Sequence, residues 1–153
     1  MSEAPVPLAR LFAMAYRSLV DDLHERLAAR GWAGVRPAFG FVLLALRAGP
    51  VSLRELPGVL GTSKQAVSKL VEAMVAAGFA ERASDPADSR AKRVQLSARG
   101  RVLLADVEEI WAELERGWGE LLGQDRLDGL RGDLVTVLRA AHGGTLPEVR
   151  TVS

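Results

Sequence analysis

Six polar side chains lie in the stretch GTSKQAVSKL, residues 61–70. They are Thr62, Ser63, Lys64, Gln65, Ser68 and Lys69. A carboxamide can pair with adenine and an ammonium group can reach guanine or a phosphate, while the short hydroxyls let a helix approach closely. These side chains therefore predict contacts to double-stranded DNA, and the alternative is an ordinary amphipathic helix that exposes polar residues to water.

A second basic group follows in the stretch SDPADSRAKRVQLSARG, residues 84–100. The pattern predicts a strand over residues 79–84, a turn that contains Pro86 and Asp88, and a returning strand over residues 93–96. Arg90 and Lys92 then lie near the tip of a hairpin, where an arginine can enter the minor groove of DNA beside the first helix. A solvated surface hairpin is the alternative.

Two spacings in the middle of the chain are typical of helix starts. Ser52 with Glu55, and Thr62 with Gln65, are predicted capping boxes, each opening a helix. The first helix reaches residue 60 and is expected to be short or bent because Pro57 lies inside it. The second buries an apolar face and ends at Gly78. A short helix, a turn at Gly61 and a second helix form a helix-turn-helix, and with the hairpin they form a winged helix.

Longer helices flank this region. Apolar residues at three- and four-residue steps predict a helix that ends near residue 30, a buried helix over residues 38–46, a long helix over residues 97–122 and a final helix that follows it. The apolar stripes of the first and last helices have few partners within one small domain. Pairing with a second copy of the chain would cover them, and closure of a monomeric bundle is the alternative.

The distribution of charge agrees with a nucleic-acid partner. The chain of 153 residues has a net charge of +1, but residues 61–101 hold eight Lys or Arg against four acidic residues, a balance of +4. The longest apolar run, residues 39–46, is too short to span a membrane, and no signal-peptide core precedes Arg17. We therefore expect a cytoplasmic protein.

The sequence offers little for catalysis or metal binding. It has no cysteine, no nucleophile motif and no phosphate-binding glycine loop, so we expect neither an enzyme nor a cofactor. His24 and His142 lie far apart without further ligands at zinc spacing, so we expect no metal. Four acidic residues of the long helix are predicted to form its solvated face, namely Glu108, Glu109, Glu113 and Glu115.

Residues 60–100 resemble the recognition helix and wing of the MarR family of transcriptional regulators, with an Asp-x-Arg element at Asp88 and Arg90. The resemblance implies that Asp88 braces a basic residue while Arg90 enters the minor groove. Ser97 replaces a common threonine, Ser89 replaces a usual arginine or glycine, and Pro57 is unusual. The flanking helices agree in length and order, so the resemblance extends over nearly the whole chain.

The family resemblance implies a mainly α fold with a small β-hairpin wing, and three parts: residues 1–34 and 101–153 for dimerisation, and residues 35–100 for DNA binding. It implies a bacterial homodimeric repressor with a near-palindromic site and a small aromatic or phenolic effector. Candidate pocket residues are Tyr16, Trp32, Phe39, Phe41 and Trp111. The alternatives are a winged-helix module that binds another protein, and another family of winged-helix regulators.

Overall fold

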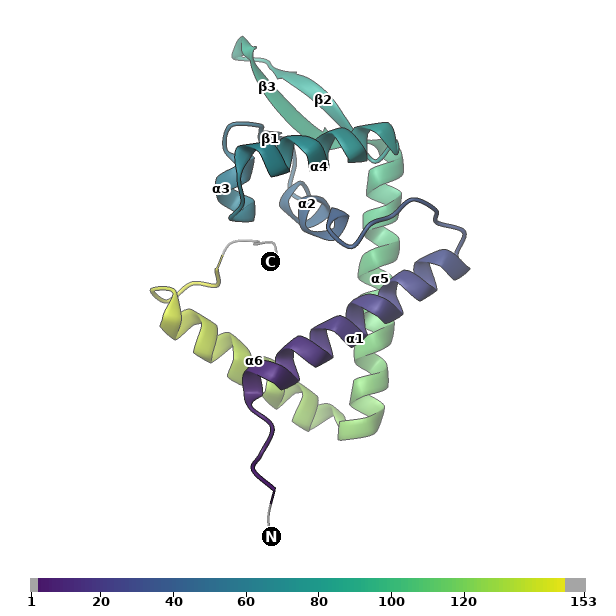
Figure 1. The fold of residues 1–153 in the computed structure, drawn as a ribbon, viewed down its shortest axis with the longest axis vertical. Coiled ribbons are helices and arrows are strands. Elements are labelled where there is room, and N and C mark those ends of the chain that lie inside the picture. The colour runs from purple at the N-terminus through teal and green to yellow at the C-terminus, as the bar shows by residue number, and fades with distance from the viewer. Residues whose placement is uncertain (1–2, 148–153) are drawn as a thin grey trace.

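The computed structural model describes residues 3–147, apart from the side chains of residues 89–91. It is mainly helical with one small sheet, as the sequence predicted, and long helices carry a winged-helix region at one end (Figure 1). The elements in chain order are α1 (Leu8–Ala29), α2 (Phe39–Ala45), β1 (Val51–Ser52), α3 (Leu56–Leu60), α4 (Lys64–Ala76), β2 (Ala80–Asp85), β3 (Asp88–Leu96), α5 (Ala98–Leu122) and α6 (Gln124–Ala141).

The segment from α2 to β3, residues 39–96, is called the winged-helix unit below. Its buried side chains come from α2, α3, α4 and the strands, and they share one continuous core with Leu23 and Leu27 of α1 and with Leu103, Val107 and Ile110 of α5. The core therefore crosses both of the boundaries that the sequence suggested at residues 34 and 100.

The sheet has three strands in the order β1-β3-β2, all antiparallel, whereas the sequence predicted only the β2-β3 hairpin. Val51 pairs with Val94, which places β1 along the base of the wing. The predicted capping box at Ser52 is wrong, because this extended pairing delays the helix to Leu56 and the Ser52 hydroxyl instead accepts from the Arg54 N–H. Pro57 stands in the first turn of α3, where a missing N–H has no cost.

Helix α4 is the second helix of the helix-turn-helix, and its N-cap lies one residue later than the predicted one. Ser63, not Thr62, is the N-cap, and its hydroxyl accepts from the Ala66 N–H at 3.1 Å. At the other end Gly78 follows the helix with φ +83°, a left-handed conformation that glycine adopts without strain. The chain then turns directly into β2.

The start of α5 is fixed tightly against the end of α4. The Ser97 hydroxyl accepts from the Gly100 N–H at 3.0 Å and donates to the Gly78 carbonyl at 2.6 Å. At Gly100 an added Cβ would lie 1.9 Å from the Phe79 carbonyl oxygen, so only glycine fits there. The Arg99 guanidinium lies over both Trp32 and Phe79, at 5.8 and 5.2 Å from the ring centroids.

The end of α1 is attached to α5 by ion pairs and one polar contact. Arg30 pairs with Asp106, Glu109 and Glu113 of α5, at 2.7 to 3.4 Å. The Trp32 indole N–H donates to Asp106 at 2.7 Å. The face of acids that the sequence placed in solvent is thus partly used to position α1.

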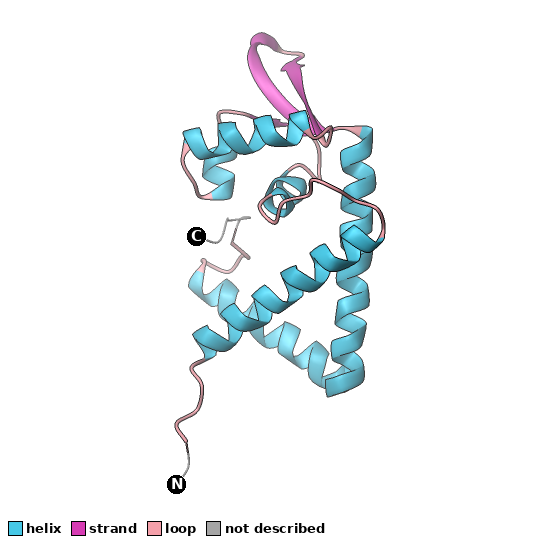
Figure 2. Ribbon diagram, turned by 45° about the vertical axis from the view of Figure 1, so that its right-hand side comes forward, coloured by secondary structure: helices cyan, strands magenta, loops and turns pink. Residues whose placement is uncertain are grey.

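The first half of α1 (residues 8–18) and the whole of α6 are called the helical arm below. They lie on the side of the winged-helix unit opposite to the wing, where α6 starts at the foot of α5 and crosses α1 in both views (Figures 1 and 2). In the arm the buried apolar side chain is Leu127, while many others are exposed: Leu8, Leu11, Phe12, Met14, Leu130, Val137 and Leu138.

Helix α2 is buried on one side only, which corrects the expectation of a helix buried all round. Phe39, Val42 and Leu43 are in the core, but Leu44 is 51% exposed. None of the helices within residues 3–147 combines the length and the apolar character that a membrane span requires.

Candidate nucleic-acid interface

Helix α4 divides its side chains between the core and solvent. Val67, Val71 and Met74 are buried, and the opposite face exposes Lys64, Gln65, Ser68 and Lys69. The Ser63 hydroxyl is used as the helix cap, and Thr62 is half-buried in the turn before it. The structure therefore brings four of the six predicted polar residues together on one exposed helix face.

The wing projects beyond α4 on the side opposite to α5 and the arm (Figure 1). Asp88 and Lys92 are exposed on β3, while the side chain of Arg90 lies outside the described residues. The loop before β3 is held by Asp85, whose carboxylate accepts from the Ala87 N–H at 2.9 Å and lies 3.7 Å from the Arg93 guanidinium. This ion pair was not predicted from the sequence, although Asp85 before Pro86 is a common turn signal.

A third basic position lies beside the wing. The Leu53 N–H donates to the Lys92 carbonyl at 3.1 Å, which holds the connection from β1 to α3 against β3. Arg54 is exposed on this connection. It lies next to a wing cation because β1 pairs with β3, and the sequence pattern gave no sign of that pairing.

A cavity of about 240 Å³, called the interhelix cavity below, lies among α1, α2 and α5. Tyr16, Phe41 and Trp111 line it, together with His24 and Arg36. Trp32 and Phe39, two of the predicted pocket residues, do not. Phe39 points into the core at 1% exposure, and Trp32 is held under Arg99 by the contacts described above.

Burial changes the acid-base properties of two groups in the interhelix cavity. It lowers the pKa of His24 below 6.5, against the opposing effect of the Asp21 charge. It also raises the pKa of Tyr16 above 10.0. Both groups are therefore favoured in their neutral forms.

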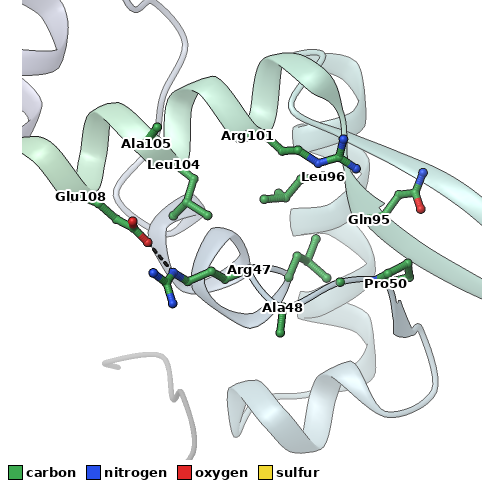
Figure 3. A pocket seen from close by; sticks show the side chains of 11 residues that line it. Arg47, Ala48, Pro50, Gln95, Leu96, Arg101, Leu104, Ala105 and Glu108 are labelled. Carbon is green, nitrogen blue, oxygen red and sulfur yellow. Dashed lines mark hydrogen bonds and ion pairs between the residues drawn. The ribbon is translucent and has the colours of Figure 1, made fainter.

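A second cavity of about 550 Å³, called the junction cavity below, lies where the end of α2 and β3 meet α5 (Figure 3). Its lining residues are Leu46, Arg47, Ala48, Gly49, Pro50, Gln95, Leu96, Arg101, Leu104, Ala105 and Glu108. Arg47 forms an ion pair with Glu108, which raises the pKa of Arg47 through a hydrogen bond and its charge. Glu108, predicted to be simply solvated, lines both cavities.

In the part of the chain that the structure describes, the remaining polar groups do not form a metal centre. Within residues 3–147 no three His, Asp or Glu side chains are grouped so that they could hold a metal ion. The His142 imidazole Nδ1 lies 2.8 Å from the Leu138 carbonyl at the end of α6.

Comparison with known proteins gives a consistent picture. The profile of the MarR family matches residues 34–91. The chain is similar to apo wild-type MarR from E. coli, with a TM-score of 0.71 and 25% identity over 89% of this chain and 99% of that chain. No curated protein sequence matches it.

Two similar structures contain DNA. The transcriptional repressor CouR, bound to a 23-mer DNA duplex, has a TM-score of 0.69 and 27% identity, over 89% of this chain and 99% of that chain. A mutant MarR from E. coli complexed with operator DNA has a TM-score of 0.68 and 26% identity, over 87% and 94%. Both alignments extend well beyond the winged-helix unit.

Proposed function

The chain belongs to the MarR family of winged-helix transcriptional regulators, a family of DNA-binding proteins rather than enzymes, and we propose that it acts as a homodimeric repressor. The observation that carries this proposal is the exposed polar face of α4 beside a basic wing. As such a repressor, it acts on DNA in the bacterial cytoplasm.

Each DNA contact follows from the position of its side chain. Gln65 and Lys64, in the first turn of α4, lie where a recognition helix meets base edges. Lys69 and Ser68, one turn further along, suit phosphate contacts. The short side chains of Thr62 and Ser63 let the N-terminus of the helix approach the DNA backbone closely.

The wing is proposed to supply the minor-groove contact. Arg90 enters the groove, Asp88 orients the basic residues of the wing, and Lys92 contacts a phosphate. The Arg90→Ala variant is expected to bind more weakly and to lose preference for A/T pairs beside the half-site.

A protein-binding function for the winged helix is less well supported. A protein interface normally has an exposed aromatic or apolar anchor at its centre. The exposed large apolar residues in the described part of the chain lie outside α4, at positions such as Leu8, Leu121 and Val137. The exposed face of α4 instead carries cations and hydrogen-bonding groups.

The helical arm supports a dimer. Leu8 and Val137 are 69% and 65% exposed, and their neighbours on α1 and α6 are apolar as well. Water contact at so many apolar side chains is unfavourable, and burying them against a second copy removes that cost. In this proposal residues 1–34 and 101–153 form the dimer, and residues 35–100 bind DNA.

The dimer sets the geometry of the operator. Two α4 helices related by a two-fold axis contact successive major grooves when they are about 34 to 36 Å apart. The expected operator is therefore a near-palindrome. A small aromatic or phenolic effector in the interhelix cavity, against Tyr16, Phe41 and Trp111, would change this separation because the cavity lies between the arm and the winged-helix unit.

The test is selection of duplexes from a random library by the purified protein, followed by fluorescence anisotropy at two salt concentrations. A near-palindromic sequence whose affinity falls steeply with salt is the expected result, because Lys and Arg contacts to phosphates release counterions. Weak binding with no enriched sequence would reject the proposal.

A further inference from the structure

Helices α1 and α4 end in the same way. Gly31 and Gly78 follow the two helices in left-handed conformations, with φ of +90° and +83°. The next residue is aromatic in both cases, Trp32 and Phe79, and its N–H donates to a carbonyl five residues earlier, at 3.0 and 2.9 Å. This Schellman motif fixes the direction in which the chain leaves a helix. Trp32 is therefore attached to the end of α1, and Phe79 to the end of α4.

The two aromatic rings meet. The ring centroids of Trp32 and Phe79 are 6.0 Å apart at an interplanar angle of 56°, within the range of favourable aromatic pairs. Phe79 is fully buried and also packs edge-on against Phe39 of α2. The connection from α1 to α2 runs beside α5 in both views (Figures 1 and 2). The end of α1 is thus packed against the end of α4.

Helix α5 holds this aromatic pair with two of its residues. The Trp32 indole N–H donates to one oxygen of Asp106 at 2.7 Å, in a part-buried, charge-assisted hydrogen bond. The other oxygen of Asp106 lies 3.3 Å from the guanidinium of Arg30, the residue that caps the end of α1. The Arg99 guanidinium lies over the rings of both Trp32 and Phe79. Trp32, Phe79, Arg99 and Asp106 are called the aromatic joint below.

The aromatic joint differs from the other polar contacts of α1. The ion pairs of Arg26 and Arg30 join α1 to α5 alone. The aromatic joint reaches further, because Phe79 connects α4 to β2 and so to the wing. A change in the angle between α1 and α4 would move one ring past the other and strain the hydrogen bond to Asp106.

We propose that the aromatic joint fixes the angle between α1 and α4, with Trp32 and Asp106 as positioning residues that set the half-site separation of the operator. Helix α1 carries part of the proposed dimer surface, so this angle sets the distance between the two α4 helices of a dimer. One additional base pair between the half-sites lengthens the DNA by about 3.4 Å. The effect on the operator rests on the proposed function, whereas the fixed angle in the free protein does not.

Three variants separate the aromatic joint from the other contacts of α1. Trp32→Phe keeps a ring beside Phe79 but removes the N–H that donates to Asp106. Trp32→Leu removes the ring as well and keeps an apolar side chain. Arg26→Gln is the matched control, because it removes an ion pair to Glu113 between α1 and α5, outside the aromatic joint.

The first measurement needs no DNA. The chain has no cysteine, so Glu25→Cys on α1 and Glu72→Cys on α4, both exposed, provide the two spin-label sites. Labelled chains are diluted with unlabelled ones, and double electron–electron resonance then measures the distance within one chain. We expect one narrow distribution with the native Trp32 and with Arg26→Gln, a broader one with Trp32→Phe, and the broadest with Trp32→Leu.

The second measurement uses the operator that the wild-type protein selects. Its Kd is compared with the Kd for duplexes whose half-sites are one base pair closer or further apart. In Trp32→Leu the ratio of these Kd values should fall roughly fivefold, because a charge-assisted hydrogen bond and a cation–π contact no longer fix the angle. Arg26→Gln should keep the wild-type ratio within about twofold, since an exposed ion pair contributes little.

The two measurements fail independently. Equal distance distributions with and without Trp32, or the same broadening in Arg26→Gln, would overturn the proposal whatever the protein binds. If the distributions broaden as expected but no operator is selected, the repressor proposal fails and the fixed angle stands. A uniform loss of affinity at all spacings in Trp32→Leu would reject the positioning role alone. Where urea denaturation shows that Trp32→Leu does not fold, Trp32→Phe decides both measurements.

Discussion

In the winged-helix unit, α4 turns Val67, Val71 and Met74 into the core, whereas in the helical arm α6 buries only Leu127 and leaves Val137 65% exposed. Both helices are amphipathic by sequence. The difference shows that the winged-helix unit satisfies its apolar surface within one chain, while the arm does not. Changes in the first region should therefore affect folding, and changes in the second should affect association.

The largest effect is expected at Gly100, where α5 meets the winged-helix unit. The Gly100→Ala variant would place a Cβ 1.9 Å from the Phe79 carbonyl oxygen, a backbone atom that cannot move without disrupting β2. We expect the free energy of unfolding to fall by about 3 kcal/mol or more. Urea denaturation at fixed protein concentration measures this change.

The matched control is Gly117→Ala in the same helix. A Cβ at Gly117 would meet nothing within 4 Å, so this variant should gain about 0.5–1 kcal/mol from helix propensity. Equal behaviour of the two alanine variants would show that the close approach at Gly100 is unimportant.

Substitutions in the helical arm should weaken dimerisation. The Val137→Lys variant introduces a charge into the apolar stripe of α6, and the dimer dissociation constant should rise about tenfold or more, because at least 1.5 kcal/mol of apolar burial is lost. Sedimentation equilibrium measures this constant. Thr136→Lys is the control, since Thr136 lies on the other side of α6, where its hydroxyl donates to the Gly132 carbonyl. A dimer that tolerates Val137→Lys would exclude α6 from the interface.

The exposed face of α4 should affect specificity more than stability. The Gln65→Ala variant should lose about 1–3 kcal/mol of discrimination at one base pair if Gln65 contacts a base. Anisotropy titrations against operators altered one pair at a time measure this. A uniform loss across all sequences would instead assign Gln65 to the phosphate contacts.

The smallest effect is expected from His24 in the interhelix cavity. Because burial lowers its pKa in the folded state, the unfolded chain binds a proton more readily, and stability present above pH 6.5 is lost as the pH falls below it. Asp21 opposes this shift, and Arg36 and Glu108 line the same cavity. The His24→Gln variant should show a shallower decrease of the urea midpoint between pH 7.5 and pH 5. An unchanged slope would assign the dependence to other groups.

Much of the fold follows from local sequence signals. The helices with long apolar periods were predicted close to their observed bounds, and Ser97 begins α5 as expected because its hydroxyl caps the first turn. The caps predicted within the helix-turn-helix were less accurate. Ser63 caps α4 where Thr62 was predicted, and Ser52 caps no helix. At the start of α4 two neighbouring hydroxyls, Thr62 and Ser63, could serve equally well, so the sequence alone did not decide between them. At Ser52 the pairing of β1 with β3 delayed the helix, and no local pattern records that pairing.

By itself the sequence determined the order of helices, the polar face of α4 and the basic hairpin, because helix period, turn residues and caps are local properties. Only the tertiary structure decided that Val51 and Ser52 join the sheet, that Glu108 pairs with Arg47, and that Trp32 supports Arg99 instead of lining a cavity. Each of these contacts joins residues more than 40 positions apart. Such pairs depend on how the packed elements meet, and no short sequence pattern records that.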